Sequence, residues 1–264
     1  MVNKSLTKKR RREILLIALL LLVVLLVITS VRACTRRKRH AAQKQQTKTE
    51  AQSQKQPALS PQTKLKNAAA QTGNTAQLIN KTHTLPPSYV PKDLVKVNAA
   101  SYRTVYLRKE AAQALATMFN AGKKAGVNLY CSSGYRSYAD QQKIFSNHMA
   151  SMGRARANAI SSKAGQSEHQ SGFAMDVTCR AMSGDLQERF IQTNEGKWLA
   201  AHAHEYGFIV RFPKGKEAST GYSYEPWHIR YLGKDLATKV NASGLSYEEY
   251  LAKNAKLATV IDGQ

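Results

Sequence analysis

Acidic residues are scarce in this chain: its 264 residues include 17 Asp and Glu against 40 Lys and Arg, which gives a formal net charge of +23. A charge of this size invites a nucleic-acid partner. The excess is uneven, however, because residues 1–40 hold 11 basic residues and one acid, whereas residues 78–264 hold 24 and 15. No module of aromatic and basic residues accompanies the charge. We therefore predict that the chain binds no nucleic acid, and that its moderately basic C-terminal part suits an anionic polymer surface.

Cysteine is also scarce, and three residues leave at least one thiol unpaired within the chain. Cys131 and Cys179 each end an apolar alternating stretch, which would turn both thiols toward the same core face. Two small buried hydrophobic residues and a disulfide between strands both fit that placement. Cys34 follows Val-Arg-Ala and loosely resembles a lipoprotein processing site, but the Arg beside the small residue argues against processing there.

Long hydrophobic runs are missing except for one, from Ile14 to Val31, which has 18 residues and no charge. This length is near the lower limit for a transmembrane helix and is long for the apolar part of a cleaved signal peptide. We therefore predict an uncleaved signal anchor at residues 14–31, preceded by a basic cytoplasmic tail at residues 1–13. Six basic residues before the run and five after it leave the orientation undecided by charge.

Large apolar side chains are rare in residues 32–77, which after residue 40 are rich in Gln, Lys, Ala, Thr and Ser. Such a composition cannot form a core and predicts a disordered polar linker. A flexible coil of this length reaches on the order of 30–40 Å. The folded part of the chain is then a single domain at residues 78–264.

Hydrophobic periodicity and glycine stops predict separate blocks of helix and strand in this domain, with no internal repeat. The expected helices are 107–124, 138–152, 186–206 and 247–257, and the expected strands are 127–132, 173–179, 208–212 and 227–232. The second helix should bury Ile144, Phe145 and Met149. Because the blocks do not alternate as βαβ units, we predict an α+β fold with a central antiparallel sheet flanked by helices.

Two short segments carry side chains that can hold a metal ion. In the strand 173–179, alternation puts Phe173, Met175 and Val177 on the core face and turns Asp176 toward the opposite face. Gly172 breaks any helix between His169 and Asp176, so the two side chains can converge from a loop and a strand.

The second segment is Glu225-Pro226-Trp227-His228. Pro226 holds Glu225 extended and bends the chain, which can bring Glu225 and His228 into one pocket. Two imidazoles and a carboxylate form the ligand set of a catalytic zinc that keeps one position for water, and a nearby glutamate can act as general base. His169, Asp176 and His228 are the predicted ligands, and the predicted cofactor is Zn²⁺.

These segments belong to a wider set of motifs that resembles one known family: Ser133-Gly134-Tyr135-Arg136-Ser137, Ser167-Glu168-His169 through Asp176, and the run from Gly221 to Tyr231. They are similar to the VanY-type zinc carboxypeptidases of bacterial peptidoglycan, the D-alanyl-D-alanine and LD-carboxypeptidases of peptidase family M15, subfamily B. The resemblance spans about residues 78–235. It implies a small α+β zinc-peptidase domain.

Residue by residue, the resemblance implies that Glu225 takes a proton from the zinc-bound water and that His169, Asp176 and His228 hold the metal. It also places Arg136 against the substrate, as a carboxylate clamp or an oxyanion stabiliser. Gln141 and Ser167 match substrate-binding positions, although a solvated helix residue and a loop cap would also explain them.

The function that the resemblance implies is a membrane-anchored zinc carboxypeptidase that removes the C-terminal D-alanine from peptidoglycan stem peptides. The same motifs serve D,D- and L,D-carboxypeptidases, and we favour the D,D bond. We expect a single-pass protein of the cell membrane with its catalytic domain extracytoplasmic, where the substrate lies. Two alternatives are a peptidoglycan endopeptidase of endolysin type and a catalytically inert wall-binding module, which should lack a ligand or the base.

Overall fold

The computed structural model describes residues 74–254, so the predicted tail, signal anchor and nearly all of the linker lie outside the described residues. Among the helices that it does describe, none is both long and apolar enough to cross a membrane. The segments predicted at 1–13, 14–31 and 32–77 therefore stay predictions.

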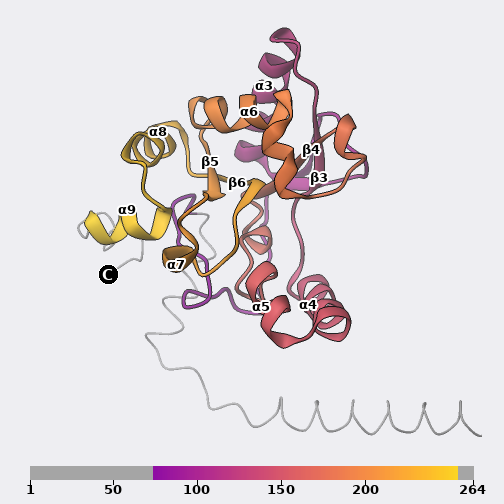
Figure 1. Ribbon diagram of the computed structural model, residues 1–264, viewed down its shortest axis with the longest axis vertical. Helices are drawn as coiled ribbons and strands as arrows, with labels where there is room; N and C mark the ends of the chain where they lie inside the picture. Colours follow the sequence, from indigo (N-terminus) through magenta and orange to yellow (C-terminus); the bar gives the residue numbers. More distant parts are fainter. Residues whose placement is uncertain (1–73, 255–264) are drawn as a thin grey trace, which may run out of the picture. The chain divides into compact units, whose positions relative to one another are not determined.

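An antiparallel sheet of four strands, in the order β3-β4-β6-β5, forms the centre of the domain (Figure 1). Its strands are β3 (Leu129–Ser133), β4 (Ala174–Cys179), β5 (Phe208–Phe212) and β6 (Glu225–Tyr231). A separate two-stranded sheet pairs β1 (Leu94–Lys96) with β2 (Tyr106–Arg108). The predicted α+β fold with a central antiparallel sheet is confirmed.

Helices surround this sheet, and α4 and α5 form a pair of their own in Figure 1. The α-helices are α3 (Lys109–Lys124), α4 (Tyr138–Met152), α5 (Arg154–Ile160), α6 (Asn194–His202), α7 (Glu217–Thr220), α8 (Lys234–Ser243) and α9 (Tyr247–Lys253). The 3₁₀ turns are η1 (Glu168–Ser171), η2 (Arg180–Met182), η3 (Glu188–Gln192) and η4 (Ala203–Tyr206).

The single helix expected at residues 186–206 is wrong, because the structure divides it into η3, α6 and η4. Thr193 is extended, and its hydroxyl accepts a hydrogen bond of 3.0 Å from the backbone N–H of Gly196, which starts α6 afresh. Gly196 lies so close to the chain before it that a Cβ there would be 2.0 Å from the carbonyl oxygen of Phe190. The apolar periodicity continues across this break, which is why the pattern reads as one helix.

The main core lies between α3 and the sheet. Leu115 and Met118 of α3 pack with Phe173, Met175 and Val177, so the predicted core face of β4 is confirmed. On α4, by contrast, Ile144, Phe145 and Met149 are only half-buried, and Gln141 is the residue that the helix buries.

Cys131 and Cys179 are fully buried free thiols in the main core. They lie on neighbouring strands, Cys131 opposite Val177 and Cys179 opposite Leu129. Burial raises the pKa of Cys131 to about 12. Of the two arrangements that the sequence allowed, the structure has the pair of small buried residues.

Candidate active site

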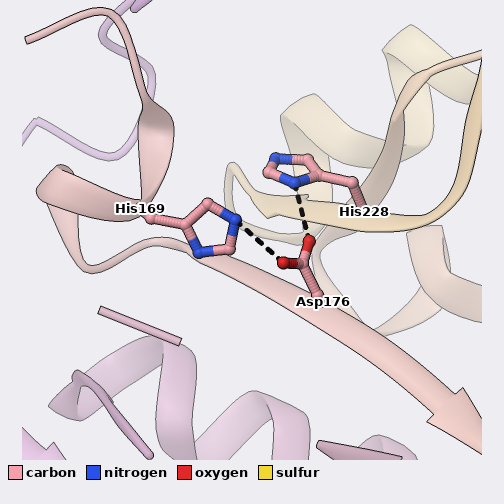
Figure 2. A group of neighbouring side chains, drawn as sticks. All are labelled: His169, Asp176 and His228. Atoms are coloured by element: carbon pink, nitrogen blue, oxygen red, sulfur yellow. Dashed lines mark hydrogen bonds and ion pairs between the residues drawn. The ribbon is translucent and has the colours of Figure 1, made fainter. Parts of the chain in front are cut away.

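The three predicted metal ligands lie together, with the side chains of His169 and His228 turned toward Asp176 (Figure 2). His169 comes from η1, Asp176 from β4 and His228 from β6, where strand pairing sets Asp176 directly opposite His228. The Nε2 atom of His169 lies 3.3 Å from one carboxylate oxygen of Asp176, and Nδ1 of His228 lies 3.0 Å from the other. All three residues are at most 4% exposed. The convergence predicted for them is confirmed.

The arrangement of donor atoms fits a divalent metal ion. The Nδ1 atom of His169 lies 2.7 Å from the carbonyl oxygen of Gly134, which can only accept, so Nδ1 carries the proton. That leaves the lone pair on Nε2, a buried atom with no hydrogen-bond partner. Ligand atoms about 2.0–2.1 Å from a tetrahedral zinc lie roughly 3.3 Å apart, which is close to the distances of 3.3 and 3.0 Å from Asp176 to the two imidazoles.

The charged side chains in and around this group shift one another's pKa values. Burial raises the pKa of Asp176, but the neighbouring His169 and His228 outweigh it and hold the pKa well below its usual range. Burial and the nearby Arg136 lower the pKa of His169 to about 4, so its imidazole is neutral and ready to bind a metal. For His228, burial lowers the pKa, but the hydrogen bonds that its ring donates to the Asp176 and Glu168 carboxylates outweigh burial and raise the pKa to about 9. The proton that metal-free His228 holds must therefore leave when a cation binds.

Glu225 begins β6 beside this group. Residues three apart on a regular strand face opposite sides, yet the Glu225 carboxylate lies 3.9 Å from Nδ1 of His228. The β5–β6 pairing shifts register between Val210 and Phe212, opposite this stretch, and the irregularity brings both side chains to one side. Burial raises the pKa of Glu225 to about 7, although the charge on His228 opposes the rise. A carboxylate with such a pKa can exchange a proton with water near neutral pH.

A pocket of about 450 Å³ opens over the group and contains all seven residues singled out in the sequence. Its walls also include large apolar side chains: Ile144, Ile160, Leu186, Phe212, Tyr222 and Trp227. A pocket that combines large apolar side chains with several polar and charged groups suits a small substrate or a chain end. From α4, Gln141, Ile144 and His148 thus line the pocket instead of the core.

Arg136, Gln141 and Ser167 present polar groups to this pocket. Within residues 74–254, the Arg136 guanidinium forms no ion pair, and its buried Nε has no hydrogen-bond partner. Gln141 is tied down by a 2.6 Å hydrogen bond from its Nε2 to the carbonyl of Ser162, which leaves the buried Oε1 free to accept. The pocket therefore offers an unpaired guanidinium and an unpaired amide oxygen.

Sequence reasoning missed the charged residues behind the metal ligands. Glu168 is 2% exposed, and one of its oxygens accepts hydrogen bonds from Arg211 at 2.8 Å and Arg230 at 2.9 Å. Its other oxygen lies 3.4 Å from Nε2 of His228. Nothing in the spacing of these residues links them. The one available signal is that Glu168 adjoins the predicted ligand His169.

A buried His-Asp-His group beside a glutamate whose side chain is 13% exposed, in a pocket with a free guanidinium, defines a metallohydrolase type of site. The model of the VanY family, described as D-alanyl-D-alanine carboxypeptidase, matches residues 104–234. The putative carboxypeptidase YodJ of Bacillus subtilis (strain 168) is 44% identical over 189 residues, which are 70% of this chain and 69% of that protein.

Two solved structures of carboxypeptidases are also similar to this chain in sequence and fold. A structure of the LdcB LD-carboxypeptidase is 45% identical with a TM-score of 0.66, over 69% of this chain and 87% of that one. The vancomycin resistance D,D-pentapeptidase VanY in complex with Zn(II) is 30% identical with a TM-score of 0.58, over 67% and 98%. The chain belongs to the VanY family and is a carboxypeptidase.

Proposed function

We propose that this protein is a zinc carboxypeptidase that removes the C-terminal D-alanine from peptidoglycan stem peptides. The observation that carries the proposal is the buried group His169, Asp176 and His228, which lies beside Glu225 in the lining of the pocket. The VanY structure with Zn(II) supports zinc as the metal.

In this proposal His169, Asp176 and His228 hold the metal. Zinc, when bound, supplies a Lewis acid that lowers the pKa of water to about 7 and polarises a carbonyl. Glu225 takes the proton of the attacking water and passes it to the amine of the departing D-alanine. Its burial suits it to both transfers, since a pKa near neutrality makes it neither too weak a base nor too weak an acid.

Arg136 supplies a positive charge for the negatively charged groups of the substrate. Its guanidinium can pair with a substrate carboxylate or with the negative charge that develops on the scissile carbonyl oxygen. Gln141 can accept a hydrogen bond from a substrate N–H, and the hydroxyl of Ser167 lines the same pocket. A site that recognises a free chain end favours a carboxypeptidase over an endopeptidase of endolysin type.

Substitution Arg136→Ala is expected to lower kcat/KM roughly 10- to 150-fold, because a hydrogen bond to a charged group contributes about 1.5–3 kcal/mol. Arg136→Lys should recover only part of the loss, since an ammonium cannot bind a carboxylate with two parallel hydrogen bonds. Steady-state kinetics with a D-alanine-terminated peptide measures both. Arg180→Ala, which changes an exposed arginine on η2, is the control. Unaltered kcat/KM in Arg136→Ala would remove Arg136 from the mechanism.

Removal of the metal should abolish activity and weaken the fold. We expect a chelator such as EDTA to inactivate the protein and stoichiometric zinc to restore it. At zinc concentrations about 100 times the dissociation constant, binding should stabilise the protein by about 2.7 kcal/mol relative to the metal-free form. Peptidase assays and urea unfolding with and without zinc test this. Full activity after complete removal of metal would contradict the proposed function.

The bond that is cut is expected to be the L,D bond of tetrapeptides. The motifs do not separate the two bonds, and the preference for the D,D bond gives way here because the 45% identity with the LdcB LD-carboxypeptidase exceeds the 30% identity with the D,D-pentapeptidase VanY and supports the L,D assignment. Incubation with defined tetra- and pentapeptides, followed by mass spectrometry of the products, distinguishes the two. A tetrapeptide with an amidated C-terminus should resist cleavage, whereas an endopeptidase would accept it.

We also propose that the enzyme is anchored in the cell membrane through residues 14–31, with its catalytic domain outside the cell. The uncharged run of 18 residues supports the anchor, and the linker at residues 32–77 would hold the domain away from the bilayer. The location of peptidoglycan stem peptides supports the orientation.

A further inference from the structure

Behind the metal ligands lies a buried row of alternating charges, formed by Glu248, Arg211, Glu168 and Arg230. Arg211 binds the Glu248 carboxylate through both Nη atoms, at 2.8 and 2.6 Å, and donates from Nε to Glu168 at 2.8 Å. Arg230 donates to the same Glu168 oxygen at 2.9 Å. The two arginines are 0% exposed. Such a row is costly to bury unless each charge is paired, as each one here is.

Both ends of the row are closed by segments outside the family match at residues 104–234. Glu248 belongs to α9, and its Oε1 also accepts a 3.1 Å hydrogen bond from Asn80. At the other end, Nη2 of Arg230 donates to the carbonyls of Thr75 at 2.8 Å and Gln77 at 2.9 Å. The segment before β1, through Thr75, Gln77 and Asn80, and the helix α9 are thus connected to Glu168 by hydrogen bonds. Glu168 is the residue next to the predicted ligand His169.

Glu168 makes the link to the metal site. Its Oε2 faces Nε2 of His228 at 3.4 Å, while Nδ1 of the same ring faces Asp176. A carboxylate behind one ring nitrogen keeps the proton there and leaves the lone pair of the other for the metal. The direction of the Glu168 carboxylate depends in turn on the two guanidiniums that hold its Oε1.

We propose that Glu168 and Glu248 are positioning residues of the metal centre, Glu168 by orienting His228 and Glu248 by acting on Glu168 through Arg211. Without Glu248, Arg211 has only Glu168 as a carboxylate partner and pulls it away from His228. The helix α9 then contributes to the geometry of the metal site as well as to packing. This inference rests on the proposed zinc site.

The test measures zinc affinity of the full-length protein by competition with a chromophoric chelator. Glu168→Gln should weaken zinc binding about 10- to 100-fold, the usual effect of losing a group that orients a ligand, and Glu248→Gln less, about threefold to tenfold. Glu248→Asp keeps the charge and should restore most of the affinity. The visible spectrum of the cobalt-substituted protein should change in Glu168→Gln, because the geometry at His228 changes.

A matched control separates positioning from simple loss of stability. Glu249, the next residue on α9, pairs with Lys216 at 2.8 Å and completes the capping box of the helix, but it does not touch Arg211. Glu249→Ala removes both contacts and should destabilise α9 without weakening zinc binding. Equal losses of affinity in Glu248→Gln and Glu249→Ala, or wild-type affinity in Glu248→Gln, would overturn the inference. A wild-type protein that binds no zinc would instead overturn the proposed function.

Discussion

Substitution Glu225→Gln is expected to lower kcat by about 10²–10⁴-fold, the usual contribution of a positioned general acid or base. The amide has nearly the same shape as the carboxyl group, but it cannot take a proton from water or return one to the leaving amine. Zinc binding should survive, because Glu225 is not among the three predicted ligands. Measurement of kcat and of bound zinc on the same preparation tests the two halves of this expectation.

The exposed Glu217 on α7 provides the control, since Glu217→Gln makes the same chemical change outside the pocket and should leave kcat unchanged. The result that would exclude Glu225 as the base is a kcat within a few-fold of wild type in a variant that still binds zinc.

The Glu225→Gln substitution should also change how the stability of the metal-free protein depends on pH. Burial raises the pKa of Glu225 from 4.5 to about 7 in the folded state, so ionisation of this group costs stability as the pH rises across that interval. Glu225→Gln should therefore match the wild type near pH 4.5 and exceed it above pH 7, by on the order of 1–3 kcal/mol. Urea unfolding at a series of pH values, with chelator present, gives this difference.

Substitution Glu168→Ala should be among the most destabilising single changes in the domain, at about 3–5 kcal/mol in the metal-free protein. It removes the acid that both Arg211 and Arg230 bind and leaves Arg230 with backbone carbonyls alone. A buried guanidinium without a carboxylate retains its full desolvation cost. Urea unfolding of the metal-free protein measures the loss apart from any effect on zinc.

Glu248→Ala should cost clearly less, because Arg211 keeps its bond to Glu168 and the Glu248 side chain is itself 14% exposed. The difference between the two losses of unfolding free energy therefore reflects how much more buried Glu168 is than Glu248. If Glu168→Ala proved no more destabilising than Glu248→Ala, the row would not depend on Glu168 as its central acid.

Much of the site could be predicted because it lies in short, distinctive stretches of sequence. The alternation of β4 gave Asp176 the face opposite Met175 and Val177, and the structure confirms it. The four residues from Glu225 to His228 carry both a predicted ligand and the proposed base. The helix expected at 186–206 failed because periodicity does not register an extended residue such as Thr193 between two helical segments.

By itself the sequence determined the α+β class, the core face of β4, and the His-Asp-His group with its glutamate, because these depend on local periodicity and on motifs of a few residues. Only the tertiary structure decided that α4 lines the pocket and that Cys131 and Cys179 stay as buried thiols. It alone joined Glu168 to Arg211, Arg230 and Glu248. Those contacts join residues far apart in the chain, and no local pattern encodes which distant charges will be buried together.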